Sequence, residues 1–190
     1  MKKSVLYSAE PDWKTSHPGT HRLIPEQAAS WIYEPESITR RLRCLYNNQV
    51  DVELLFHQHS LPFLSENQLL KQSSQHYSLI REVMLKSNGN PLILARTVIP
   101  IKTLHGAQRI LSRLGNKPLG EVIFSYPKLQ RLEMQVCKIA SSHWLPEITN
   151  RTNLHDSIWA RRTIYAIKNR QLLVSEFFLP EITGNIINLE

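Results

Sequence analysis

The stretch YSLIREVMLKSNGNPLILARTVIPI, residues 77–101, determines the fold class that we predict for this chain. It contains two runs rich in aliphatic and β-branched residues, 77–87 and 90–101, which are typical of strands. Between them stands Asn88-Gly89, the dipeptide that most readily takes the positive φ angles of a type I′ turn. We therefore expect an antiparallel hairpin across this stretch.

An arginine lies on the apolar side of each strand of this hairpin. Alternate side chains of a strand share a face, so Arg81 points with Leu79 and Val83, and Arg96 points with Leu94. A two-residue turn places Arg81 directly opposite Arg96. Like charges that face each other repel, and burying either without a partner costs several kcal/mol. We expect an anionic group between or near them.

The rest of the chain extends this pattern to an α+β fold. We expect helices at 25–33, 37–46 and 103–114, strands at 50–57 and 129–139, a second hairpin from 159–167 and 171–179, and a long surface loop at 141–156. Residues 1–24 are expected to form a loose N-terminal arm before one domain, 25–190. Because tight hairpins join most strands, we predict an antiparallel sheet of about six strands with flanking helices.

The last strand places a carboxylate on an apolar face. Glu176 is the only charge that points with Val174 and Phe178, and it lies opposite Arg161 or Thr163, depending on the position of the second turn. One interpretation is a closed internal salt-bridge network of Arg81, Arg96, Arg161 and Glu176. The other is a pocket for an anion. Three arginines against one glutamate leave a positive excess, which favours a small ligand that bears a carboxylate or phosphate.

Composition narrows the classes of protein that fit. The chain has 190 residues, is 42% hydrophobic and 21% charged, and is therefore expected to be globular; it has no run long enough to span a membrane and no apolar core of a secretory signal. Two distant cysteines and scattered histidines predict neither disulfides nor a metal site. A net charge of +7 leaves nucleic acid, acidic lipid and anionic metabolites open as partners. We interpret the basic run at 40–43 as a solvated helix face.

Three segments resemble the chorismate pyruvate-lyase family, in its order and nearly its spacing. They are REVMLKSNGNPLILARTVIPIKTL at 81–104, RLGNKPLGEVIF at 113–124 and WARRTIYAIKNRQLLVSEFFLP at 159–180, and the longer form is similar to the cyanobacterial and red-algal plastid branch. The resemblance implies an antiparallel sheet with flap helices, elimination of pyruvate from chorismate to give 4-hydroxybenzoate, and an early step toward ubiquinone or plastoquinone. It also implies a monomer without metal or organic cofactor, in the bacterial cytoplasm or the plastid stroma.

The resemblance also assigns site residues. It implies that Arg81 binds the ring carboxylate and that Glu176 is the catalytic glutamate. It places backbone contacts to the ligand at Ile38, where the family usually has methionine, and at Leu119. Arg96 matches a second family arginine near the pocket, which would suit the other carboxylate of chorismate.

Two other classes of function stay open. Ligand-sensing domains of GntR-type repressors resemble this fold and bind small effectors without turnover, so a non-catalytic domain that senses aromatic acids is the main alternative. The residues before Pro25 are too few for a winged helix-turn-helix, so a regulator would need a separate DNA-binding partner. A nucleic-acid-binding module would show steep salt dependence and no response to aromatic acids. The sequence gives no motif for it, and we expect no nucleic-acid partner.

Overall fold

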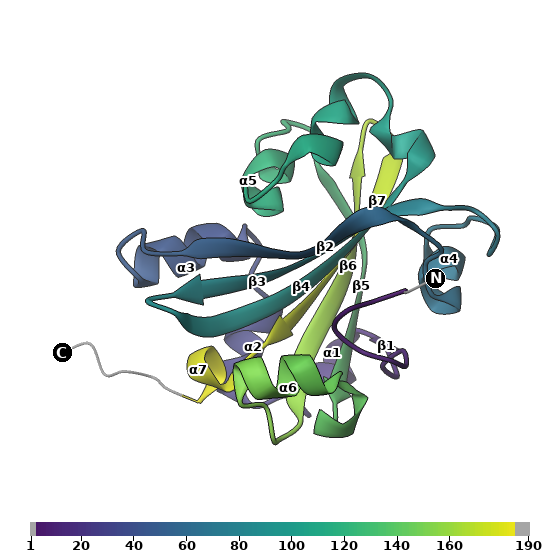
Figure 1. The fold of residues 1–190 in the computed structure, drawn as a ribbon. Coiled ribbons are helices and arrows are strands. Elements are labelled where there is room, and N and C mark those ends of the chain that lie inside the picture. The colour runs from purple at the N-terminus through teal and green to yellow at the C-terminus, as the bar shows by residue number, and fades with distance from the viewer. Residues whose placement is uncertain (1–2, 185–190) are drawn as a thin grey trace.

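A computed structural model describes residues 3–184 of the chain, without the side chains of 106–108. It contains a seven-stranded antiparallel sheet in the order β1-β5-β6-β7-β4-β3-β2 (Figure 1). The strands are β1 (Lys14–Thr15), β2 (Asp51–Ser60), β3 (Ser78–Ser87), β4 (Asn90–Pro100), β5 (Gln130–Ile139), β6 (Ile158–Ile167) and β7 (Arg170–Phe178). The predicted α+β class is confirmed. The seventh strand is the short β1, which pairs with β5.

Helices cover both faces of this sheet. They are α1 (Pro18–His21), α2 (Glu26–Ile32), α3 (Ile38–Leu45), α4 (Leu64–Leu69), α5 (Leu119–Phe124), α6 (Pro146–Thr152) and α7 (Pro180–Thr183), with 3₁₀ segments at Ile101–Leu104, Gly106–Arg113 and Ser141–His143. No helix within residues 3–184 is long and apolar enough to cross a membrane.

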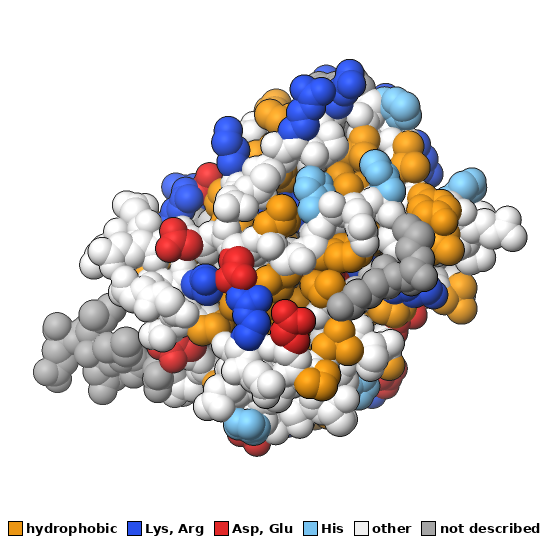
Figure 2. All heavy atoms as spheres, in the orientation of Figure 1, with side chains coloured by type: hydrophobic (Ala, Val, Ile, Leu, Met, Phe, Trp, Pro, Cys, Tyr) orange, Lys and Arg blue, Asp and Glu red, His pale blue; other side chains and the backbone are white. Residues whose placement is uncertain are grey.

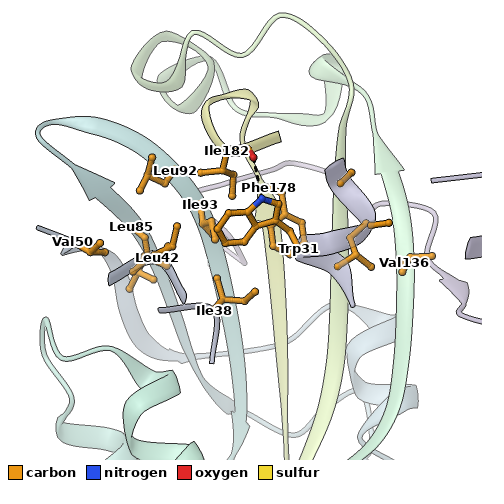
Figure 3. Packing of buried hydrophobic residues seen from close by; sticks show 14 of the residues in the cluster. Trp31, Ile38, Leu42, Val50, Leu85, Leu92, Ile93, Val136, Phe178 and Ile182 are labelled. Atoms are coloured by element: carbon orange, nitrogen blue, oxygen red, sulfur yellow. Dashed lines mark hydrogen bonds between the residues drawn. The ribbon is translucent and has the colours of Figure 1, made fainter. Parts of the chain in front are cut away.

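The largest apolar cluster joins α2, α3 and α7 to one face of the sheet (Figure 3). Trp31 of α2 packs there against Phe178 of β7 and Ile93 of β4, and its indole Nε1 donates a 3.0 Å hydrogen bond to the carbonyl of Ile182. Leu42 of α3 is fully buried in the same cluster. These contacts fix the positions of α2 and α3 over the sheet, because an apolar helix face is held mainly by the surface it buries.

The first hairpin has the predicted turn but not the predicted register. Asn88 and Gly89 both have positive φ, and Ser87 pairs with Asn90. A β-bulge then skips Leu92, so that beyond it Arg81 pairs with Thr97 instead of Arg96. One inserted residue moves every later side chain to the other face. The prediction that Arg81 and Arg96 face each other is therefore wrong.

The second hairpin decides between the two registers considered for it. Lys168 and Asn169 have positive φ and form the turn, since Ile167 pairs with Arg170. Glu176 consequently pairs with Arg161 and not with Thr163.

Two other expectations are wrong, each because of where the segment buries its apolar side chains. The segment 141–156, predicted to be a surface loop, contains α6 and buries Trp144, Ile148 and Leu154.

The segment 103–114 forms 3₁₀ turns instead of an α-helix. Its buried Leu111 and Leu114 are three residues apart, which suits the 3₁₀ period.

The N-terminal arm, expected to be loose, packs onto the sheet at residues 4–7. Leu6 and Tyr7 are almost fully buried against the face of the sheet opposite α2 and α3. Ser4 Oγ and the backbone N–H of Val5 donate hydrogen bonds of 2.6 and 2.7 Å to the two carboxylate oxygens of Glu82. A buried carboxylate therefore fastens this segment, which the weak sequence pattern of the arm does not reveal.

Candidate functional site

A cavity lies between the sheet and the first turns of α3 and α5. Its lining residues are Ser37, Ile38, Thr39, Val52, Arg81, Val83, Leu85, Ala95, Thr97, Pro118, Leu119, Gly120, Ile123, Phe124, Tyr165, Val174 and Glu176. Most of them are apolar, and the ionisable ones are an arginine, a tyrosine and a glutamate. A mostly apolar cavity with a few convergent polar groups is typical of a small-molecule site.

Arg81 is a buried cation without a carboxylate partner in the part of the chain that the structure describes. Its side chain is nearly inaccessible, and Nη2 donates hydrogen bonds of 2.9 and 3.0 Å to the carbonyls of Gly115 and Lys117. Nε has no hydrogen-bond partner, and no carboxylate of the described residues lies within 4.0 Å of the guanidinium. Burial lowers the pKa of Arg81 to about 10, so the group is still charged at neutral pH.

Glu176 enters the cavity from β7 as half of an ion pair. Its Oε2 accepts a 2.6 Å hydrogen bond from Nε of Arg161, and its side chain is 13% exposed. Nη1 of Arg161 donates to the carbonyls of Ile32 and Glu34, both at 2.9 Å. Although burial opposes it, the charge of Glu176 raises the pKa of Arg161 above its ordinary value. Arg161 thus holds the carboxylate and the end of α2 together.

Ile38 and Leu119 begin the two helices that close the cavity. Ser37 precedes Ile38 as the N-cap of α3, where its Oγ accepts from the N–H of Arg40. Pro118 is the N-cap residue before Leu119 in α5 and makes no side-chain capping hydrogen bond. The first N–H groups of a helix have no partner within it, so they are available to a ligand. The helices approach so closely that a Cβ on Gly120 would lie 2.6 Å from Ser37 Oγ.

Arg96 is not part of this cavity. Because of the bulge in β4, it lies on the other face of the sheet, where it is fully buried. Nε and Nη2 donate to the carboxylate of Glu66 at 2.7 and 2.9 Å, and Nη1 donates to Glu82 at 2.6 Å. The expectation that Arg96 binds a ligand carboxylate beside Arg81 is therefore wrong. The closed network predicted as one interpretation, of Arg81, Arg96, Arg161 and Glu176, is also absent. The ion pairs of Arg96 and Arg161 lie on opposite faces of the sheet, and neither contains Arg81.

Two side chains near the site were not predicted from the sequence. Tyr165 lines the cavity, accepts a 3.1 Å hydrogen bond from Arg131 at its hydroxyl, and has its pKa raised by burial and by Glu176. His57 of β2 pairs with Arg81 across the strands, and its buried Nε2 has no hydrogen-bond partner among the described residues. Burial and the charge of Arg81 lower the pKa of His57. Tyr165 could have been found, because it alternates with Arg161 along β6.

These groups suit a flat anion better than a metal ion. Within the described part of the chain, no three His, Cys, Asp or Glu side chains come together as a metal site. The Arg81 guanidinium can pair with a carboxylate, and the apolar walls can hold a ring. Glu176 lies at the same cavity and can accept a proton or a hydrogen bond.

Solved structures resemble the chain in fold alone. A GntR-family transcriptional regulator from Bacillus cereus superposes with a TM-score of 0.54 at 14% sequence identity, over 70% of this chain and 93% of the other. The C-terminal domain of the histidine utilization repressor from Pseudomonas syringae pv. tomato gives 0.54 at 7% identity, over 70% and 93%. At such low identity the fold is shared and the ligand is not indicated.

Sequence comparison is more specific. A protein from Methylococcus capsulatus named "Probable chorismate pyruvate-lyase" is 39% identical over 153 residues, 80% of this chain and 94% of its own length. One of the same name from Coxiella burnetii is 33% identical over 186 residues, 96% and 95% of the two chains. Both are bacterial and lend no support to the plastid branch. The family model described as "Chorismate lyase" matches residues 12–186, and the chain belongs to the chorismate lyase family.

Proposed function

We propose that the protein eliminates pyruvate from chorismate to give 4-hydroxybenzoate in the cavity beneath α3 and α5. The observation that carries this proposal, beside family membership, is Arg81, a buried guanidinium at the cavity with an unpaired Nε and no carboxylate partner among the described residues. A buried cation of this kind is stabilised when a carboxylate ligand pairs with it. Chorismate carries one carboxylate on its ring and another on its enolpyruvyl group.

The ring carboxylate pairs with Arg81 in this proposal. The N–H groups at the start of α3 and α5, at Ile38 and Leu119, bind the remaining carboxylate lone pairs. Val83, Val174 and Ile123 then contact the ring from the walls of the cavity. A charge-assisted pair in a site without bulk water both neutralises the anion and fixes its position.

Glu176 assists the elimination at the far end of the ring. The bond between ring carbon C3 and the ether oxygen breaks, and its electron pair leaves with enolpyruvate, which becomes pyruvate. The hydrogen on C4, the carbon that bears the hydroxyl, is lost as a proton, and its bonding electrons complete the aromatic ring. Glu176 accepts that proton or a hydrogen bond from the hydroxyl that becomes the phenol. Arg161 is a positioning residue, since it holds the carboxylate without contacting the ring.

Closure of the cavity by two helices favours retention of the product. 4-Hydroxybenzoate keeps the ring carboxylate that Arg81 recognises, so we expect slow release and product inhibition. We also propose that this product serves as the precursor of a quinone ring, as the family resemblance implies. The protein works as a monomer without a cofactor in this proposal.

The test is to incubate the purified protein with chorismate and to measure 4-hydroxybenzoate by chromatography and pyruvate by a coupled assay. We expect equimolar products, which are lost in Arg81→Met and kept in Arg170→Met, an arginine far along the sheet at the β6–β7 turn. If 4-hydroxybenzoate raises the melting temperature but chorismate is not converted, the protein is a sensing domain on the same fold. If neither occurs, the assignment of the cavity is wrong.

A further inference from the structure

Beyond the cavity, one end of the molecule is covered by cations that lack carboxylate partners within residues 3–184. Figure 2 shows Lys and Arg side chains gathered at the top of the view, over the segment between β4 and α5. Exposed residues there are Lys102, Arg109 and Arg113, and Arg170 is held beside them by a hydrogen bond to the carbonyl of His105. None of these four forms an ion pair with a described residue.

The absence of acidic residues along the chain segment distinguishes this end from the rest of the surface. Residues 83–120 contain no Asp or Glu. Other exposed cations without an ion pair to a described residue, such as Arg22, Lys128 and Lys138, come from separate parts of the chain, whereas Arg40, Lys86 and Arg43 pair with Glu36, Glu53 and Glu121. A surface region that carries only positive charges attracts an anionic partner.

Apolar side chains lie among these cations. Ile101 and Ile110 are 45% and 53% exposed, and Tyr77 is 44% exposed. A groove lined by Lys71, His76, Tyr77, Ile101 and Lys102 continues the surface toward β3. The segment keeps its inner side apolar, since Leu111 and Leu114 are buried while Arg109, Ile110 and Arg113 face outward. Basic residues around exposed aliphatic ones are typical of segments that lie in the interface of a membrane.

We propose that this end of the molecule, from Ile101 to Arg113 with Lys71, Tyr77 and Arg170, docks on an anionic lipid bilayer. The cations attract the lipid phosphates, and Ile101 and Ile110 enter the boundary between headgroups and acyl chains. A nucleic acid would meet the charge but offers no apolar layer for the isoleucines. A second copy of the chain would bring the same positive charge. The lipid surface therefore matches both features at once.

Docking here brings the catalytic cavity close to the bilayer. The docking segment continues directly into Gly115 and Lys117, whose carbonyls accept the hydrogen bonds of Arg81. The proposal does not depend on the reaction in that cavity, because it rests on surface residues outside the lining of the site. Its test is consequently a binding measurement.

The experiment is co-sedimentation of the full chain with vesicles of phosphatidylcholine alone, and with vesicles in which about a third of the lipid is phosphatidylglycerol. We expect binding to the second kind alone, with the bound fraction falling as salt is raised. Lys102→Glu/Arg109→Glu/Arg113→Glu should weaken binding at least about tenfold, because each cation near an anionic surface contributes about fivefold. Lys14→Glu/Arg22→Glu/Lys138→Glu has the same net charge and should retain most of the binding.

The apolar contribution has its own pair of variants. Ile101→Ser/Ile110→Ser should weaken binding to anionic vesicles severalfold, whereas Leu23→Ser/Leu132→Ser, at sites that are 74% and 50% exposed, should not. All variants should keep the wild-type unfolding curve. The proposal is overturned if the wild type does not bind anionic vesicles at low salt, or if the two charge variants lose binding equally. Tight binding to duplex DNA that neither serine variant changes, with no vesicle binding, would assign the surface to nucleic acid instead.

Discussion

Arg161 and Glu176 face each other on neighbouring strands, with Nε of the arginine 2.6 Å from Oε2 of the glutamate. The same guanidinium binds the carbonyls of Ile32 and Glu34 through Nη1. One buried side chain therefore joins the carboxylate of the cavity to the connection between α2 and α3. A substitution of Arg161 therefore affects both the Glu176 carboxylate and the connection between α2 and α3.

Arg161→Met tests this connection. It leaves the Glu176 carboxylate without its partner, so we expect a loss of about 3–5 kcal/mol in the free energy of unfolding. Arg161→Met/Glu176→Met should recover much of that loss, because an apolar pair of similar volume replaces the ion pair. Neither variant should convert chorismate. Urea unfolding and product assays on the three proteins check this, and an Arg161→Met protein as stable as the wild type would contradict it.

Two buried arginines should respond differently to the same substitution. Arg96 has two carboxylate partners, so Arg96→Met should cost about 3–5 kcal/mol of stability. Among the described residues Arg81 has only carbonyl acceptors, so Arg81→Met should cost no more than about 1–2 kcal/mol. Binding of 4-hydroxybenzoate should weaken about 10- to 100-fold in Arg81→Met. Calorimetric titration and urea unfolding separate the two effects, and equal losses of stability would refute the distinction.

Gly120 is required where α3 and α5 meet. A methyl group there would lie 2.6 Å from Ser37 Oγ, so Gly120→Ala must displace the serine or separate the helices. We expect a KM for chorismate raised severalfold. Ser37→Ala/Gly120→Ala removes the clashing oxygen and should restore binding, although loss of the N-cap costs about 1 kcal/mol. A double variant with the same KM as Gly120→Ala would show that the approach of the helices is not the cause.

His57 gives the protein a pH dependence. Its native pKa lies below the ordinary 6.5, because of burial and the charge of Arg81. The unfolded chain therefore binds a proton more readily, so this contribution to stability is present above pH 6.5 and is lost as the pH falls through the native pKa. His57→Gln should lose less stability than the wild type between pH 7.5 and 5.5, as measured by urea unfolding. If His57→Gln and the wild type lose the same free energy of unfolding between these two pH values, His57 does not titrate in this way.

The sequence predicts the pieces of the sheet well, because local turn chemistry determines them. Asn88-Gly89 predicts the turn of the first hairpin, and the turn of the second hairpin takes one of the two positions considered for it, Lys168-Asn169. A β-bulge has no comparable signal, since Leu92 looks like any other aliphatic strand residue. Its effect is nonetheless large: it moves Arg96 away from the cavity and pairs Thr97 with Arg81.

For the same reason, the candidate site could be predicted from the sequence only in part. Alternation places Arg81 and Glu176 on inward faces, and family resemblance adds Ile38 and Leu119; all four line the cavity. Neither the alternation of side chains nor the family resemblance predicts contacts between segments that are distant in sequence. The binding of the N-terminal segment to Glu82 is one example, because it depends on where the sheet brings a buried carboxylate.

The order of strands also determines how the cavity forms during folding. Arg81 belongs to the hairpin of β3 and β4, whereas Glu176 and Arg161 belong to that of β6 and β7. Only the pairing of β4 with β7, in which Ala95 meets Glu176, brings these two local units together. Because a pairing so distant in sequence is slow, the hairpins should form before the binding site exists. In a refolding experiment, recovery of ligand binding should then report the last association of the two halves of the sheet.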